Sequence, residues 1–227
     1  MGEIPMTTTL NRQTMSSGLT ALLRDAILNG QIAEGTQLRQ DALARQYEVS
    51  RIPVREALRQ LEAEGLIIGH AHRSSVVASL SLSEITEIFE IRSILEPHLL
   101  RRSLIHLSTA DFDRAESVLD AYDAALDAGD MARWGELNWV FHQMLLEPAE
   151  RPQTMAIVDG LRRRVDRYTR LQINLTDGAR KSRLEHRAIL AKARAGAVED
   201  CAAMVRDHIL GAAGDLTGFL RDNYGKA

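Results

Sequence analysis

The chain has 227 residues, a formal net charge of −3, 45% hydrophobic residues and 26% charged residues. This composition is ordinary for a globular protein of one large or two small domains. No apolar run approaches the roughly 18 residues that a membrane helix needs, and the N-terminal MGEIPMTTTL lacks the basic and apolar parts of a secretory signal. Cys201 is the only cysteine, so an internal disulfide is excluded. We therefore expect a cytoplasmic protein without a membrane partner, in which any contact with nucleic acid comes from a local basic surface.

Helical spacing of apolar residues runs through most of the chain, whereas strand signals are confined to a region near residues 66–80. The expected fold class is therefore mainly α. Residues 1–15 are polar and unpatterned, which predicts a loose tail. An amphipathic helix is expected over residues 17–29, and the turn NGQIAEGTQL ends it. Its predicted buried face comprises Leu19, Leu22, Leu23, Ala26 and Ile27.

Two short helices joined by a tight turn follow this first helix. The later one begins in EVSRIPVREALRQLEAEGLI, where Ser50 suits the N-cap and Pro53 falls in the first turn, which does not need its N–H. Gly65 ends that helix, and residues 66–80 have the pattern of a small hairpin. This order of elements predicts a winged helix-turn-helix, a DNA-binding fold.

Three arginines recur along one face of the third helix. Arg51, Arg55 and Arg59 are spaced four residues apart, so they share the face opposite the apolar stripe. Arginine there can hold O6 and N7 of guanine with two hydrogen bonds, or pair with a phosphate. The spacing taken alone favours a plain solvated helix face.

The segment VSRIPVREALRQLEAEGLI, preceded by AILNGQIAEGTQLRQDALA, resembles the DNA-binding domain of the GntR superfamily of bacterial transcription factors. The resemblance covers about residues 17–80. It implies that the start of the third helix enters the major groove with Ser50, Arg51, Pro53 and Arg55.

The same resemblance implies two further sets of DNA contacts. Arg39 and Arg45 would brace the preceding helix on the phosphate backbone, and His72 and Arg73 would form the wing tip beside the minor groove. The family usually has glycine where this chain has Ser74, and serine tolerates a positive φ poorly.

After residue 80 the sequence has one helical pattern after another. Ser81 or Ser83 is suited to cap the first of these helices, and Ser108 with Asp111 predicts a capping box on the second. Short connections between six helices predict an antiparallel bundle. The helices are expected over about 83–103, 109–128 and 131–146, then in a long helix ending near 175, and over 179–195 and 197–221. The basic run LRRRVDRYTR surrounds its helix, so we assign it no DNA contact and expect most of its arginines in solvent.

Three of these helices each place one histidine on an inward stripe. In NWVFHQML, Asn138 and His142 lie one turn apart at the edge of an apolar stripe, and His186 and His208 align with apolar residues of the last two helices. Any one of them is most simply a core histidine bonded to the backbone. Three imidazoles in one apolar bundle are costly unless they are organised, as a divalent metal would do. Spacings of 44 and 22 residues do not show that the rings converge.

EIFEIRSILEPHLL, NWVFHQML and SRLEHRAILAKARAGAVEDCAAMVRDHI resemble the FCD ligand-binding domain of the FadR-like branch of the superfamily, over about residues 82–222. Such a domain commonly holds a metal with three histidines and a carboxylate one turn before the first. The matching positions are His142, His186 and His208, with Asn138 where aspartate often stands. The resemblance thus implies a divalent ion, with zinc or nickel the natural choices. Because an amide brings no charge, a lower affinity or a changed ion preference is expected.

Arg92 lies on the inward stripe of the first bundle helix. A salt bridge with Glu96 is one interpretation of this arginine. The family resemblance favours a pocket arginine that binds a carboxylate with both prongs of its guanidinium. It implies a small organic acid as effector, in contact with Arg92 and Asn138.

The sequence predicts a dimeric, ligand-responsive bacterial transcription regulator that binds a palindromic double-stranded operator and is not an enzyme. Its expected parts are a tail over 1–15, a winged helix-turn-helix over 16–80, and an effector-binding and dimerisation domain over 81–227. A metal-free regulator with core or pocket histidines is one alternative. Another alternative is a metalloenzyme with a DNA-binding head. The histidines lack the neighbouring glutamate of an H-E-x-x-H motif, which argues against it. The effector, and whether it releases or recruits DNA, stay open.

Overall fold

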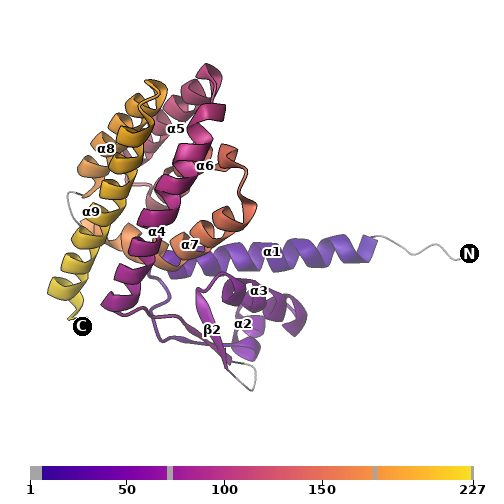
Figure 1. The fold of residues 1–227 in the computed structure, drawn as a ribbon. Coiled ribbons are helices and arrows are strands. Elements are labelled where there is room, and N and C mark those ends of the chain that lie inside the picture. Colours follow the sequence, from indigo (N-terminus) through magenta and orange to yellow (C-terminus); the bar gives the residue numbers. More distant parts are fainter. Residues whose placement is uncertain (1–6, 71–73, 176–177, 226–227) are drawn as a thin grey trace, which may run out of the picture. The chain divides into compact units, whose positions relative to one another are not determined.

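The structure is a computed structural model that describes residues 7–70, 74–175 and 178–225. It divides into two compact units, Met1–Ser79 and Leu80–Ala227, each of which is described by itself. The first unit holds three helices and a small sheet, and the second is helical (Figure 1). No helix among the described residues is long and apolar enough to cross a membrane.

The first helix, α1 (Thr7–Leu28), begins ten residues earlier than Ser17. Residues 7–15, expected to belong to a loose tail, are therefore helical. Leu19, Leu23 and Ile27 are buried as predicted, whereas Leu22 is 58% exposed. Leu22 is exposed because it lies at the edge of the apolar stripe.

Helices α2 (Gln40–Gln46) and α3 (Arg51–Ala63) form the predicted helix-turn-helix. Ser50 occupies the N-cap of α3 with extended backbone, but its side chain makes no capping hydrogen bond. Gly65 has a φ of 74°, the left-handed conformation with which glycine commonly ends a helix. The apolar face of α3 is buried as expected and comprises Val54, Ala57, Leu58 and Leu61.

The wing is a three-stranded antiparallel sheet. Strands β2 (Ile67–His70) and β3 (Ser74–Val77) form the predicted hairpin, and β1 (Gln37–Arg39) pairs with the other edge of β3, giving the order β1-β3-β2. We did not predict β1, because three residues are too few to show an alternating pattern. Ser74 is the first residue of β3, where extended backbone suits any side chain, so its place in the chain imposes no strain.

The second unit contains the six expected helices within its described residues. They are α4 (Leu82–Ser103), α5 (Thr109–Asp127), α6 (Met131–Leu146), α7 (Pro152–Leu175), α8 (Gly178–Arg194) and α9 (Val198–Tyr224). Capping boxes begin α4 at Ser81 and α5 at Ser108. Helix α4 packs against α9, and α5 packs against both α6 and α8. The buried core of the second unit includes Leu99, Leu100 and Phe141, which have no exposed surface.

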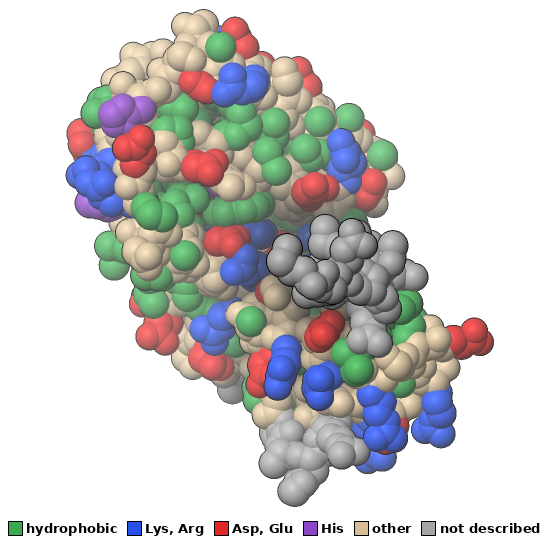
Figure 2. Space-filling view, turned by 90° about the vertical axis from the view of Figure 1, so that its right-hand side faces the viewer, with side chains coloured by type: hydrophobic (Ala, Val, Ile, Leu, Met, Phe, Trp, Pro, Cys, Tyr) green, Lys and Arg blue, Asp and Glu red, His purple; other side chains and the backbone are tan. Residues whose placement is uncertain are grey.

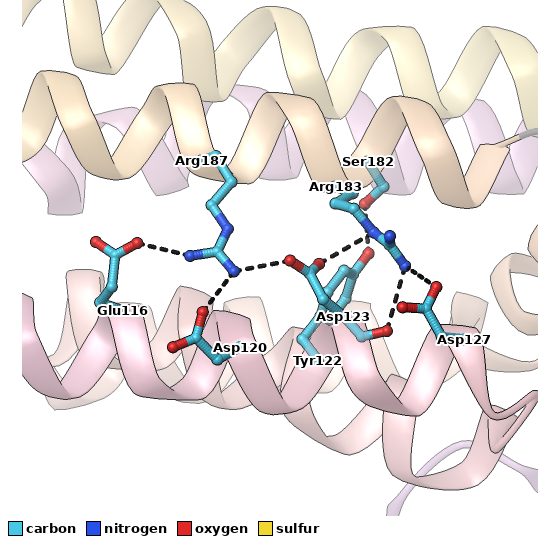
Figure 3. A network of polar contacts seen from close by, with 8 residues as sticks. All are labelled: Glu116, Asp120, Tyr122, Asp123, Asp127, Ser182, Arg183 and Arg187. Carbon is cyan, nitrogen blue, oxygen red and sulfur yellow. Dashed lines mark hydrogen bonds and ion pairs between the residues drawn. The ribbon is translucent and has the colours of Figure 1, made fainter.

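An arginine network joins α5 to α8 (Figure 3). The Arg187 guanidinium donates to Glu116, Asp120 and Asp123 at 2.6–2.8 Å. One turn earlier, Arg183 donates to Asp127 at 2.7 Å, and the Tyr122 hydroxyl donates to Ser182 Oγ at 2.8 Å. These contacts fix α8 along α5, and His186 lies between the two arginines in the chain.

Candidate functional site

The exposed face of α3 carries the three predicted arginines. Arg51, Arg55 and Arg59 are exposed and line a groove whose other wall includes Ser74 and Ser75 of β3. Lys and Arg side chains, drawn in blue, are visible on the molecular surface in Figure 2. A groove with basic side chains between a helix and a wing suits a polyanionic duplex.

Two predicted phosphate contacts are exposed near this groove. Arg39 ends β1 and donates from Nε to Gln37 Oε1 at 3.0 Å, and Arg45 donates from Nε to the Asp41 carbonyl at 3.2 Å. Arg51 pairs through Nε with the Asp41 carboxylate at 2.7 Å.

The remaining predicted DNA contacts have different outcomes. Pro53 is buried, so it shapes the start of α3 and offers no exposed surface. Ser50 is exposed at that helix start. His72 and Arg73 lie outside the described residues.

The three predicted histidines come together in the bundle. His142 (α6), His186 (α8) and His208 (α9) present ligand nitrogens that all lie within 4.8 Å of one another. His186 Nε2 is 3.3 Å from His208 Nε2, and the three ring centroids are 4.8–5.5 Å apart. Spacing in the sequence left this convergence open, and packing of α6, α8 and α9 produces it.

Burial favours the neutral form of two of the three histidines, His142 and His186. Loss of hydration lowers the pKa of both His142 and His186 well below 6.5, and the neighbouring His208 lowers them further. Neutral imidazole is the form that binds a metal through a free lone pair.

One separation between ligand nitrogens matches a divalent ion, and all three nitrogens lie within 4.8 Å of one another. Bonds of about 2.1 Å in a tetrahedral site would set neighbouring nitrogens roughly 3.4 Å apart, close to the 3.3 Å between His186 and His208. A proton shared between the two rings would also account for that one separation. The buried Nδ1 of His186 has no hydrogen-bond partner in either case. Asn138 lines the same cavity one turn before His142.

Two carboxylates beside the histidines were not predicted as part of the site. Glu185 Oε2 lies 2.6 Å from His208 Nδ1, and the fully buried Glu96 has Oε2 3.9 Å from His142 Nδ1. Glu185 precedes His186 directly in the chain, but its partner lies on another helix. Only the packing of α8 against α9 reveals that pair.

Arg92 makes the salt bridge with Glu96 and also lines the cavity, while its contact with an effector carboxylate stays a prediction. Its Nε donates to Glu96 Oε1 at 2.7 Å, and the side chain lines the cavity that Asn138, His142 and His208 also line. Arg162 of α7 lines this cavity and stacks on Trp139 at 4.5 Å. We expected most arginines of LRRRVDRYTR in solvent, but all five are half-buried, because aspartates at 159 and 166 pair with several of them.

A winged helix-turn-helix joined to a helical domain is the architecture of a DNA-binding transcriptional regulator. Residues 16–77 match the bacterial regulatory proteins of the gntR family, and residues 87–211 match the FCD domain. The chain therefore belongs to the GntR family of bacterial transcriptional regulators and carries an FCD domain. Regulators of this family bind DNA operators, FCD domains bind small-molecule effectors, and neither match is to an enzyme family.

Relatives extend over most of the chain. The HTH-type transcriptional regulator BphR of Paraburkholderia xenovorans is 31% identical over 82% of this chain and 79% of its own. The HTH-type transcriptional repressor RspR of Escherichia coli is 29% identical over 68% of each chain. The solved structure of E. coli McbR/YncC has the same fold, with a TM-score of 0.77 at 20% identity over 90% of this chain and 98% of its own.

Proposed function

We propose that the cavity between the bundle helices binds a small organic acid together with a divalent ion, and that this binding modulates operator binding. The observation that carries the proposal is that His142, His186 and His208 lie together, and that His142 and His208 line a cavity also lined by Arg92. Zinc and nickel are the ions that imidazole ligands suit best here. When bound, the ion supplies a Lewis-acidic centre with positions open to a carboxylate oxygen.

Charge balance supports an anionic effector that needs the ion. Arg92 is paired with Glu96, and Lys181 is paired with Asp215 at 2.7 Å. Arg162 lies 3.6–3.7 Å from Asp159 and Asp166. Because the chain's own carboxylates balance these cations, the positive charge that attracts an organic acid comes from a bound divalent ion.

We propose that α3 reads the operator from the major groove. Arg51 and Arg55 lie on its exposed face, and the exposed Arg39 and Arg45 would contact phosphates. The operator would be palindromic and bound by a homodimer, because two copies related by symmetry present two equal reading helices. RspR is named a repressor, and we propose that this chain also represses transcription. Binding of the effector would then release the protein from DNA.

Thermal unfolding of the full chain with small carboxylates tests the proposal. A ligand at 100 times its Kd stabilises the native state by about 2.7 kcal/mol. We expect mono- and dicarboxylates to raise the Tm in zinc- or nickel-loaded protein, and to have little effect after EDTA treatment. The Arg92→Gln variant should lose the effect, and Arg102→Gln, which changes an exposed arginine of α4, should keep it. Equal carboxylate shifts in loaded and stripped protein would reject the ion-dependent site.

A further inference from the structure

His208 and Glu185 form the closest polar contact in the histidine cluster. Glu185 Oε2 is 2.6 Å from His208 Nδ1, and His208 Nε2 faces His186. A ring nitrogen that donates to a carboxylate holds its proton there, so the lone pair is on the other nitrogen. This contact therefore directs the lone pair of His208 Nε2 towards His186.

Glu96 has the corresponding place beside His142. Its side chain has no exposed surface, and Oε1 accepts from Arg92 Nε. The other oxygen, Oε2, is buried without a hydrogen-bond partner and lies 3.9 Å from His142 Nδ1. A buried carboxylate oxygen with no donor is costly. A small rotation of the His142 ring would bring its Nδ1–H within hydrogen-bonding distance of this oxygen.

The ligands offered by the cluster carry no negative charge. Three neutral imidazoles leave a divalent ion uncompensated in a buried site, and the amide of Asn138 adds none. Charge in a site of low polarity must be balanced nearby. Glu96 and Glu185 are the two carboxylates that approach ring nitrogens of the cluster in the described residues.

We propose that Glu96 and Glu185 are outer-sphere positioning residues of the metal site, which orient His142 and His208. Because Glu96 also neutralises Arg92, Glu185 offsets one of the ion's two charges, and the other remains to attract the acid. This rests on the proposed metal binding. Arg92, Glu96 and His142 then form one chain of contacts from the effector-facing guanidinium to the ion. Through this chain, an acid bound at Arg92 alters the ion's surroundings.

Metal affinity of the full chain tests this assignment. EDTA-stripped wild type and the variants Glu96→Gln and Glu185→Gln would be titrated with zinc against a chromophoric chelator. We expect each variant to raise the zinc Kd by about 10–100-fold, the usual effect of losing an outer-sphere partner. Glu199→Gln is the matched control, because Glu199 is an exposed carboxylate of α9 that pairs with Arg101 and does not line the cavity. It should change the Kd by less than about threefold.

A second readout separates positioning from general loss of structure. The metal-free variants should retain cooperative unfolding, and their cobalt complexes should show altered visible absorption because the imidazoles are reoriented. Because Glu185 is partly exposed, Glu185→Gln still tests the inference if substitution of the buried Glu96 prevents folding. Zinc binding by wild type with unchanged Kd values in both variants would overturn the inference alone. Absence of zinc binding by wild type would overturn the proposed metal site as well.

Discussion

His186 shows at the scale of one residue what the sequence can predict. Its helical stripe placed it in the core, and it is fully buried. Its neighbours in space come from α6 and α9, beyond the reach of any local pattern. Conversely, Arg92 and its i+4 partner Glu96 lie on one helix, so their pairing could be predicted.

The buried imidazoles predict a pH dependence of stability in the metal-free protein. Above pH 6.5, both folded and unfolded chains hold His142 and His186 neutral, so these rings add no pH dependence. Below it, only the unfolded chain takes up protons, because burial lowers the pKa of both rings in the native state. The free energy of unfolding should fall by up to about 1.4 kcal/mol per pH unit for each ring.

Urea unfolding of EDTA-treated protein at pH 7.5 and 5.5 measures this effect. The His186→Gln variant is the comparison, since it lacks one of the two titrating rings. Its stability should depend less steeply on pH than that of the wild type. Identical pH slopes for both proteins would show that the ring is protonated equally in the two states.

The arginines near the reading helix should have distinct roles. Arg55→Ala should cost about 1–3 kcal/mol of discrimination between operator and scrambled DNA, because a base contact carries the sequence preference. Arg45→Ala should weaken binding to both duplexes equally. It should also reduce the slope of log K against log salt concentration by about one, as expected for a phosphate contact. Fluorescence anisotropy over a salt series measures both. Unchanged selectivity in Arg55→Ala would reject its assignment to the groove.

At the scale of elements, helices were predictable and short strands were not. The six bundle helices have bounds within a few residues of those expected, because each has a long 3.6-residue period and three of them, α4, α5 and α6, begin with a side-chain N-cap. β1 has three residues, and its pairing with β3 depends on a partner some 37 positions away. Helix α1 extends to Thr7 through a segment without an apolar stripe, which periodicity could not reveal.

The network between α5 and α8 predicts a measurable stability difference. Arg187→Met would leave Glu116, Asp120 and Asp123 facing one another without their shared cation. These groups are partly exposed, so solvent screening limits the expected loss to about 1 kcal/mol, a Tm decrease of a few degrees. Lys192→Met, which removes a single exposed pair with Asp200, should change stability by less than about 0.5 kcal/mol. Thermal unfolding at low salt compares the two, and equal Tm values would contradict a cooperative network.

At the scale of the whole molecule, the sequence predicted the chemistry of the site better than its geometry. Three inward histidines and one inward arginine could be found from stripes and from resemblance. The carboxylates at 96 and 185 and the stacked Arg162 acquire their roles from contacts between helices. Periodicity states which face of a helix is buried, but it does not state how far one helix slides along the next.

Regulation requires that the effector bind two states of the protein with different affinity. The chain consists of a DNA-binding unit and a bundle that contains the cavity, and the proposed function requires that a ligand in the bundle alter operator affinity. A coupling of about 1–3 kcal/mol, or 5–150-fold in affinity, is typical of such systems. Operator titrations with and without an acid identified by thermal unfolding would give this coupling directly.

The central claim is that three histidines from three helices hold one divalent ion. Calorimetric titration of EDTA-stripped protein with zinc tests it most directly, using wild type and the single variants His142→Ala, His186→Ala and His208→Ala. We predict about one ion per wild-type chain and a large loss of affinity in every variant. Wild type that takes up no zinc, or variants that bind it as tightly as wild type does, would contradict the claim.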